Sequence, residues 1–432
     1  MRAGSAHVLL ALLVLLCLLP GTVQAAAPSP TYTARAEQLV RILAKDGGEQ
    51  QFFSRVFLDA VPLAQWRALA ADLRRQYGVP TLLGSVRADG PTARQVEVRY
   101  PRATVGFTLV VAPAPPGRVV GLRIVGASIA NDSFESVLRD IAALPGQSAF
   151  AVARLGEGSP QWLHGHRPEA RMATASTFKL YLLAELARAV GAGERHWADV
   201  TPLARKSFSG RLAGWPDGAP MTLHSLATAM IAESDNSAAD TLLETLGRTR
   251  VDAMLARTGH AAPDAALPLL STSEAFALKM PANADLRRRY LAADLAGRRA
   301  LLMSEAARLS LSAIDVGSVA ETPTEIETIE WFASPRDSVA LLDWLRRTSG
   351  EALPIMAVNP GIAPADAKRW RTLGYKGGSE PGVIAMNFLG QAKDGTWYAV
   401  SGAWNNPAAR VDEARFVALM TRALNLLARE TP

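Results

Sequence analysis

The chain has 432 residues, a net charge of +6 and one cysteine. Its length allows two or three domains, since domains usually have about 100 to 200 residues. Cys17 lies in the apolar N-terminal segment, so disulfides, thiolate catalysis and cysteine-bound zinc are excluded for the rest of the chain. The arginine runs at 287–289 and 298–299 lie in Ala- and Leu-rich helical stretches. We interpret them as solvated faces and expect no nucleic-acid partner.

Residues 1–25 have the layout of a secretory signal. Arg2 is followed by an apolar stretch from Val8 to Leu19 and by a small-residue site at 23–25. The apolar stretch is too short to span a bilayer. We therefore expect a cleaved signal peptide, no stable membrane anchor, and a secreted, periplasmic protein that begins near Ala26.

Residues 30–130 predict a small α+β domain. Apolar residues at helical spacing over 33–78 are followed by alternating segments at 93–101, 103–112 and 117–127, with turn residues between them. The pattern predicts helices followed by two or three antiparallel strands. The order of elements is similar to that of cone-shaped, steroid-isomerase-like accessory domains. We find no catalytic motif in this segment.

Residues 133–432 predict a second, larger α+β domain. It begins with an amphipathic helix at 133–147 and is mostly helical between its first strands and about residue 350. Strands are expected near both of its ends, at 148–155, 160–168, 371–378, 382–390 and 396–404. They predict one antiparallel sheet flanked by helices, completed jointly by the two ends of the domain and followed by a last helix at 412–428.

Three short motifs in this second domain combine residue types that catalysis uses. Ser176 and Lys179 lie one helical turn apart, Ser234-Asp235-Asn236 falls between two helical segments, and Lys376 precedes two glycines. By composition these patterns are expected about 0.4, 0.02 and 0.04 times. Each residue also has a structural interpretation, as a helix cap or as an edge-strand charge. The occurrence of all three in one domain favours catalysis.

A metal site is a weaker interpretation. The only histidine pair in a short motif, at 164 and 166, lacks further ligands nearby in the sequence, and we interpret it as part of a polar hairpin. We expect no metal and no cofactor.

The three motifs resemble those of class A serine β-lactamases and penicillin-binding proteins. The likeness covers about residues 135–430, including "MATASTFKLYLLAELARAV", "AESDNSAADTLLETLG" and "YKGGSEPGVIAMNFLG". It implies a serine hydrolase that acts on a β-lactam, peptide or ester carbonyl through an acyl-enzyme at Ser176. The layout and "IEWFASPRDS" also resemble a two-domain branch encoded in the clavulanic acid biosynthetic cluster. A D-Ala-D-Ala peptidase and a catalytically weak binding module of the cell envelope are the alternatives.

The resemblance implies a role for each motif residue. Lys179 would accept the proton of Ser176 if burial and a nearby Lys376 keep it neutral. Ser234 would pass a proton to the leaving group, and Asn236 would orient Lys179 and the substrate.

The backbone N–H groups of Ser176 and Ser379 would form the oxyanion hole, and Lys376 would hold a substrate carboxylate. Gly378 would let the substrate approach the strand closely. Phe208 falls where the family has an aromatic wall, although a role in the core is an equal alternative.

Two departures from the family affect the expected chemistry. Gly377 stands where the family usually has Thr or Ser, which removes a hydroxyl that would bind a carboxylate, so we expect carboxylated β-lactams to bind poorly. No glutamate is followed four residues later by asparagine, the pattern of the deacylation base. Glu274 is the first candidate for that base, followed by the glutamates at 321, 325, 327 and 330. We expect acylation to outrun deacylation.

Overall fold

The computed structural model describes residues 30–90 and 92–430, so the predicted signal peptide lies outside the described residues. The chain divides into two compact units between Ala130 and Asn131. Within the described residues, no helix is both long and apolar enough to cross a membrane.

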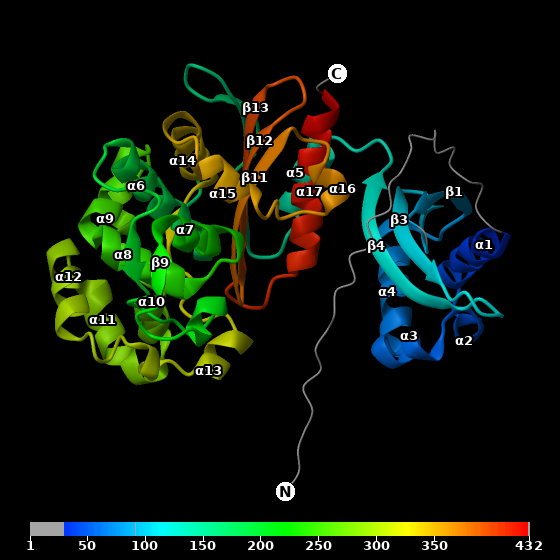
Figure 1. Ribbon diagram of the computed structural model, residues 1–432, viewed down its shortest axis with the longest axis horizontal. Coiled ribbons are helices and arrows are strands. Elements are labelled where there is room, and N and C mark those ends of the chain that lie inside the picture. The colour runs from blue at the N-terminus through cyan, green and yellow to red at the C-terminus, as the bar shows by residue number, and fades with distance from the viewer. Residues whose placement is uncertain (1–29, 91, 431–432) are drawn as a thin grey trace, which may run out of the picture. The chain divides into compact units, whose positions relative to one another are not determined.

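The first unit packs helices against a four-stranded antiparallel meander in the order β1-β2-β3-β4 (Figure 1). Its core includes Leu39, Trp66 and Phe107, contributed by two helices and the sheet. The helices are α1 (Pro30–Ala44), α2 (Glu49–Phe52), α3 (Arg55–Ala60) and α4 (Leu63–Tyr77), and the strands are β1 (Leu82–Asp89), β2 (Ala93–Arg99), β3 (Ala103–Val111) and β4 (Val119–Ile129).

The first strand, β1, is the element that sequence reasoning missed, since it expected two or three strands. The buried positions of β3 alternate regularly along the strand. By contrast, β1 lies at the edge of the sheet and has no fully buried residue. An edge strand without one buried face lacks the period-2 pattern by which strands are recognised.

The second unit is built around a five-stranded antiparallel sheet in the order β11-β12-β13-β5-β6. The predicted fold class, an antiparallel sheet flanked by helices, is confirmed. The two ends of the unit complete one sheet, because β13 pairs with β5 in register from Trp397 opposite Leu155 to Asn405 opposite Gln147. The strands are β5 (Gln147–Leu155), β6 (Gln161–His166), β11 (Thr372–Glu380), β12 (Val383–Gln391) and β13 (Trp397–Asn405).

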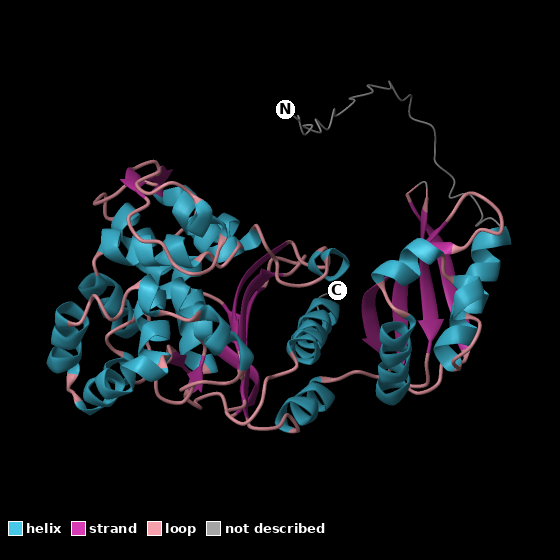
Figure 2. Ribbon diagram, turned by 90° about the horizontal axis from the view of Figure 1, so that it is seen from below, coloured by secondary structure: helices cyan, strands magenta, loops and turns pink. Residues whose placement is uncertain are grey.

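Helices cover both faces of this sheet (Figures 1 and 2). On one face, α5 (Phe134–Ala142) and α17 (Glu413–Glu430) bury a core that includes Phe150 and Phe416. On the other face lies a larger helical core built on α6 (Lys179–Gly191) and α14 (Pro335–Thr348). Its neighbours are α7 (Leu223–Ala232), α8 (Asn236–Leu246), α9 (Arg248–Arg257), α10 (Thr272–Lys279) and α15 (Ala352–Ala357). The short helix α16 (Pro364–Ala367) packs instead on the core of α5 and α17.

The stretch from about 283 to 330, which follows α10, is largely helical. It contains α11 (Ala284–Ala292), α12 (Leu295–Ser304) and α13 (Val316–Glu321). Leu286, Tyr290 and Leu302 pack from this stretch onto the helical core, which anchors it beside α10. Two short strand pairs complete the unit, β7 (Met172–Ala173) with β10 (Phe332–Ala333) and β8 (Val200–Pro202) with β9 (Pro220–Thr222).

Candidate active site

Ser176 lies in a 3₁₀ turn, Ala175–Phe178, that runs directly into α6. Its hydroxyl caps neither element, since Thr174 and Phe178 occupy the two cap positions and neither makes a side-chain cap. The residue before it, Ala175, has φ of +45°. A non-glycine residue in the left-handed region costs about 1 to 3 kcal/mol and persists only where its surroundings hold it, as at functional sites. The turn therefore presents Ser176 in a conformation that the fold enforces.

Lys179 is fully buried at the first turn of α6. Its ammonium nitrogen lies 2.7 Å from the backbone oxygen of Ser234, 3.3 Å from the Ser234 hydroxyl and 2.6 Å from Oδ1 of Asn236. Burial lowers the pKa of Lys179 to about 7, and the charges of Asp240 and Asp235 only partly oppose this shift. A substantial share of this side chain is thus the free amine at neutral pH, as a proton acceptor must be.

The Ser234-Asp235-Asn236 motif forms the junction between α7 and α8. Ser234 has φ of +57°, a second strained position, and its hydroxyl faces Lys179. Asp235 accepts the backbone N–H of Ala238 and so acts as the N-terminal cap of α8, the structural role that its sequence position also allows. Asn236 accepts from Lys179 and donates to the hydroxyl of Ser209 at 2.7 Å, which fixes its amide.

Lys376 on β11 also contacts the hydroxyl of Ser234. Its Nζ lies 2.9 Å from the Ser234 hydroxyl and it is 2% exposed, which does not suit a solvent-facing edge charge. Burial, and secondarily the charge of Lys179, hold the pKa of Lys376 well below its ordinary value. The Ser234 hydroxyl is therefore bracketed by two buried amines that disfavour each other's charge.

Gly378, two residues after Lys376 on β11, allows the strand to approach Ser176 closely. A Cβ on Gly378 would lie 2.5 Å from the backbone nitrogen of Ser176 and 2.9 Å from that of Thr177. These distances are too short for any side chain. Gly378 thus brings the strand against the turn, with Ser379 following it.

A cavity of about 550 Å³ collects most of the predicted site residues. Its lining includes seven of them: Ser176, Phe208, Ser234, Asn236, Lys376, Gly378 and Ser379. Phe208 packs edge-to-face on Phe276 at 4.7 Å between ring centroids, as part of the cavity wall. Lys179 lies behind this lining, and within the described residues the Ser176 hydroxyl makes no hydrogen bond to it. Apo sites commonly show such loose catalytic contacts.

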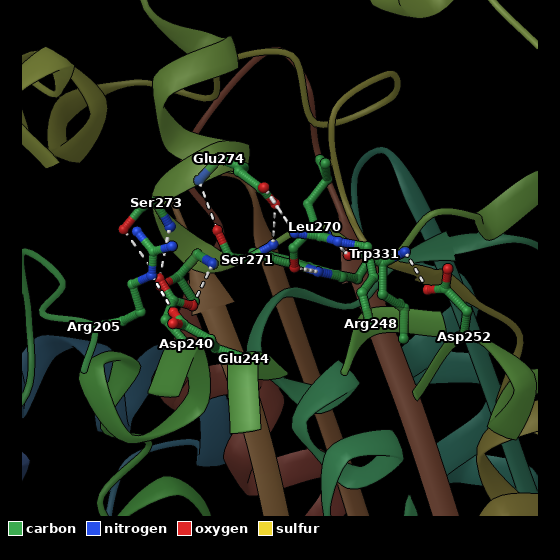
Figure 3. Close-up of polar contacts among 12 residues, drawn as sticks. Arg205, Asp240, Glu244, Arg248, Asp252, Leu270, Ser271, Ser273, Glu274 and Trp331 are labelled. Atoms are coloured by element: carbon green, nitrogen blue, oxygen red, sulfur yellow. Dashed lines mark hydrogen bonds and ion pairs between the residues drawn. The ribbon is translucent and has the colours of Figure 1, made fainter. Parts of the chain in front are cut away.

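Glu274 does not line this cavity. It belongs to the capping box of α10 and lines a different cavity of about 580 Å³. Figure 3 shows its carboxylate held by Arg248, at 2.7 and 2.8 Å, and by the backbone N–H of Ser271, at 2.7 Å. Its role here is to cap a helix and neutralise an arginine. From α10, it is Thr272 and Phe276 that reach the cavity of Ser176.

A buried cluster that the motifs did not reveal lies beside Ser176. Glu330 Oε2 accepts the backbone N–H groups of Ala175 at 3.2 Å and of Trp331 at 3.0 Å, and its Oε1 lies 3.0 Å from Nζ of Lys279. Lys279 also pairs with Glu380, which follows Ser379 on β11. The cluster therefore ties α10, β11 and the turn that carries Ser176 to one another.

The cluster contains one lysine and two glutamates, so its formal charges do not cancel. Although burial opposes its charge, the two carboxylates hold the pKa of Lys279 above its ordinary value. Burial and the neighbouring Glu330 raise the pKa of Glu380 well above its ordinary value, while Lys279 opposes that shift. Sequence reasoning named Glu330 only as one of several glutamates, and missed Lys279 and Glu380. The one signal was a lysine inside the apolar run "AFALKM".

Among the residues that the structure describes, no three His, Cys, Asp or Glu side chains converge as metal ligands. Of the predicted hairpin pair, His164 stacks on Phe134 at 3.8 Å between ring centroids.

Comparison with known proteins matches residues 133–349 to the family described as "Beta-lactamase enzyme family". This range includes Ser176, Lys179 and Asn236 and ends before Lys376. No curated protein matches the chain.

Several solved structures are similar to part of the chain. A β-lactamase from Sphaerobacter thermophilus is 20% identical, with 69% of this chain and 97% of that chain covered and a TM-score of 0.47. A β-lactamase from Chitinophaga pinensis is 16% identical, with 69% and 98% covered and a TM-score of 0.47. PBP-A is 14% identical, with 69% and 96% covered and a TM-score of 0.46.

Proposed function

This chain belongs to the β-lactamase enzyme family and is a serine hydrolase; from that premise we propose that it acts through an acyl-enzyme at Ser176. The observation that supports this most directly is the chain of contacts Lys179–Ser234–Lys376, of which Ser234 and Lys376 line the same cavity as Ser176. A buried lysine with a pKa of about 7 is a proton acceptor at neutral pH without any further base.

In the proposed acylation, Lys179 accepts the Ser176 proton as the hydroxyl oxygen bonds to the substrate carbonyl carbon. The proton then passes through Ser234 to the leaving nitrogen or oxygen as the bond to carbon breaks. Lys376 stabilises negative charge at Ser234 during this transfer. The backbone N–H groups of Ser176 and Ser379 stabilise the developing oxyanion, a contribution of about 3 to 4 kcal/mol for one such donor.

Intact-mass measurement tests this assignment. The full-length protein is incubated with penicillins, cephalosporins, small acyl esters and a D-Ala-D-Ala peptide, and the mass added by the acyl group is recorded. We expect labelling with at least one class of acyl donor and none in Ser176→Ala. Circular dichroism serves as the fold control. Undiminished labelling of a folded Ser176→Ala protein would exclude Ser176 as the nucleophile.

For the second half-reaction we propose slow deacylation. The motivation is that Glu274, the first candidate base, is bound to Arg248 and Ser271 outside the cavity. Loss of a placed general base costs a factor of about 10² to 10⁴. A chromogenic cephalosporin should therefore give a burst followed by slow turnover, and an aryl ester with a small acyl group should turn over faster. Rapid cephalosporin turnover without a burst would show that a base is present.

Export to the periplasm through a cleaved signal near Ala25 is a further part of the proposal, based on residues 1–25. Mass spectrometry of the N-terminal peptide from a bacterial envelope fraction tests it. A retained Met1 in that fraction would contradict cleavage.

A further inference from the structure

One end of the buried cluster holds the turn that carries Ser176. Glu330 Oε2 accepts the backbone N–H of Ala175, one residue before Ser176, at 3.2 Å. Ala175 has φ of +45°, so this contact holds a residue whose backbone is strained. The next residue adds a second attachment, because the backbone oxygen of Trp331 accepts the N–H of Thr174 at 2.9 Å and its hydroxyl at 2.8 Å. The turn is therefore attached to this segment directly before the nucleophile.

The other end of the cluster holds the last residue of β11. Glu380 directly follows Ser379 and pairs with Lys279, whose Nζ lies 3.0 Å from Oε1 of Glu330. Lys279 and Glu330 are buried, and the side chain of Glu380 is 7% exposed. Ion pairs so well shielded from solvent are screened little by salt. Lys279 thus forms a buried bridge between the segment that holds the turn and the end of the strand.

The strand and the turn meet between these two ends. Side chains alternate along β11, so Lys376, Gly378 and Glu380 share one face. Gly378 brings this face against the backbone nitrogen of Ser176, because a Cβ there would lie only 2.5 Å from that atom. A glycine permits such an approach but has no side chain to maintain it. The next residue on the same face, Glu380, supplies the attachment that glycine lacks.

We propose that the bridge Glu330–Lys279–Glu380 is a positioning element of the oxyanion hole, which sets the separation between the backbone N–H groups of Ser176 and Ser379. The bridge joins the residue before the first donor to the residue after the second. Both donors must lie within about 2.7 to 3.1 Å of the developing oxyanion. This inference rests on the proposed acylation at Ser176 and assigns a role in rate to a cluster so far described by its contacts.

Stability alone does not account for three charged groups at this place. Replacing a buried ion pair by apolar residues of similar volume is often neutral or stabilising, so a fold does not need such a pair to be stable. A fixed geometry is what a bridge of directional contacts adds. Because a misplacement of about 1 Å can cost about 10²-fold in rate, that geometry matters most beside the reacting carbonyl.

The test compares para-nitrophenyl phenylacetate with its thionoester, in which sulfur replaces the carbonyl oxygen. Sulfur is a weak hydrogen-bond acceptor, so acylation by the thionoester gains little from the oxyanion hole. In Glu380→Leu we expect acylation by the oxo ester to slow by about 10- to 100-fold and acylation by the thionoester by less than about threefold. The added mass gives both rates. Equal losses for both esters, or no loss for either, would overturn the proposal.

Two further variants identify the bridge as the cause. Glu380→Gln keeps an oxygen that accepts from Lys279, so it should retain most of the wild-type preference for the oxo ester. Lys279→Met cuts the bridge at its centre while Glu330 still accepts the N–H of Ala175. It should reproduce the selective loss of Glu380→Leu when measured under conditions in which it is folded. An unchanged preference in folded Lys279→Met would contradict a role for the bridge.

Asp252→Leu is the matched control. Asp252 is a buried carboxylate that accepts the backbone N–H of Leu269 at 3.0 Å and pairs with Arg299 at 2.7 Å, and it does not line the cavity of Ser176. Its replacement should lower stability but leave the ratio of the two acylation rates unchanged. If Asp252→Leu changes this ratio as much as Glu380→Leu does, the ratio reports a general loosening of the fold and the inference is wrong.

Phenylboronic acid gives a readout that needs no turnover, because boron bonds to the Ser176 oxygen and one boron-bound hydroxyl can occupy the oxyanion hole. Its dissociation constant should rise at least about tenfold in Glu380→Leu and stay unchanged in Asp252→Leu. Undiminished acylation of folded Ser176→Ala, or no reaction of wild type with any of these probes, would overturn the proposed function itself. Loss of acylation in Ser176→Ala, with the same rate ratio and dissociation constant in Glu380→Leu as in wild type, would overturn only this inference.

Discussion

The charged side chains on the two sides of Ser176 have opposite kinds of partners. On the α6 side, the contacts of Lys179 and Lys376 are to hydroxyl, amide and backbone oxygens, and burial lowers the pKa of both. On the α10 side, the carboxylates are bound to cations, Glu274 to Arg248 and Glu330 to Lys279. The difference supports the proposed acylation, which needs an uncharged base, and a structural role for these carboxylates.

The largest effect is expected from removing the free amine. Lys179→Met keeps the length of the side chain but cannot accept a proton, so the acylation rate should fall by about 10² to 10⁴. Stopped-flow or quenched mass measurements with an acyl donor that labels wild type would record it. Lys393→Met, a change at an exposed lysine near a hairpin turn, is the matched control. An acylation rate within threefold of wild type would show that Lys179 is not the base.

The sequence predicted the residues on the α6 side because each belongs to a short motif at a recognisable element end. Ser176 and Lys179 fall at the start of a helix, Ser234 and Asn236 at a helix junction, and Lys376 on a strand beside glycines. Their meeting in one cavity follows from the sheet that both ends of the unit complete.

The α10 side could not be predicted in the same way. Lys279 contacts carboxylates 51 and 101 residues away, and no local spacing encodes such pairs. The overlap that a Cβ at position 377 would make with the Tyr375 hydroxyl depends on side-chain torsions and on the backbone at Gly361, which no period in the sequence reports. Glu274 was the first candidate base in the sequence, yet in the structure its carboxylate binds Arg248.

The second-largest effect is expected on stability, from changing the buried cluster of Lys279, Glu330 and Glu380. Lys279→Met leaves Glu330 and Glu380 without their cation, and removing one partner of a buried pair typically costs about 3 to 5 kcal/mol. Chemical denaturation would measure the loss. Lys206→Met, which removes an ion pair to the exposed Asp217, should cost less than about 1 kcal/mol.

A triple variant separates charge from packing in this cluster. Lys279→Met combined with Glu330→Gln and Glu380→Gln removes the unpaired carboxylates and should recover part of the lost free energy of unfolding. If Lys279→Met is no less stable than Lys206→Met, the cluster is not a stabilising element.

The pH dependence of acylation tests the role of Lys179 on the α6 side. Only the uncharged amine of Lys179 accepts a proton, and its pKa is about 7. The acylation rate should therefore rise about tenfold per pH unit below 7 and level off above it. Burial lowers the pKa of Lys179 from 10.5 to about 7. Between these two pH values the unfolded chain therefore binds more protons than the folded chain. Unfolding free energy should accordingly fall as pH is lowered through that window toward 7. A flat rate profile below pH 7 would contradict the assignment.

The smallest effect is expected at Glu274, and it decides whether the α10 side takes part in catalysis. Glu274→Gln keeps a capping-box residue at this position of α10 but loses the charge that neutralises Arg248, so we expect a loss of about 1 kcal/mol in stability. The lifetime of the acyl-enzyme should stay within twofold of wild type, because the carboxylate lies outside the cavity of Ser176. Glu244→Gln, which removes the exposed partner of Arg205 in the same region, is the matched control (Figure 3). A lifetime at least tenfold longer in Glu274→Gln than in Glu244→Gln would mean that α10 moves its carboxylate to the acylated serine during turnover. The division between a catalytic and a structural side would then be wrong.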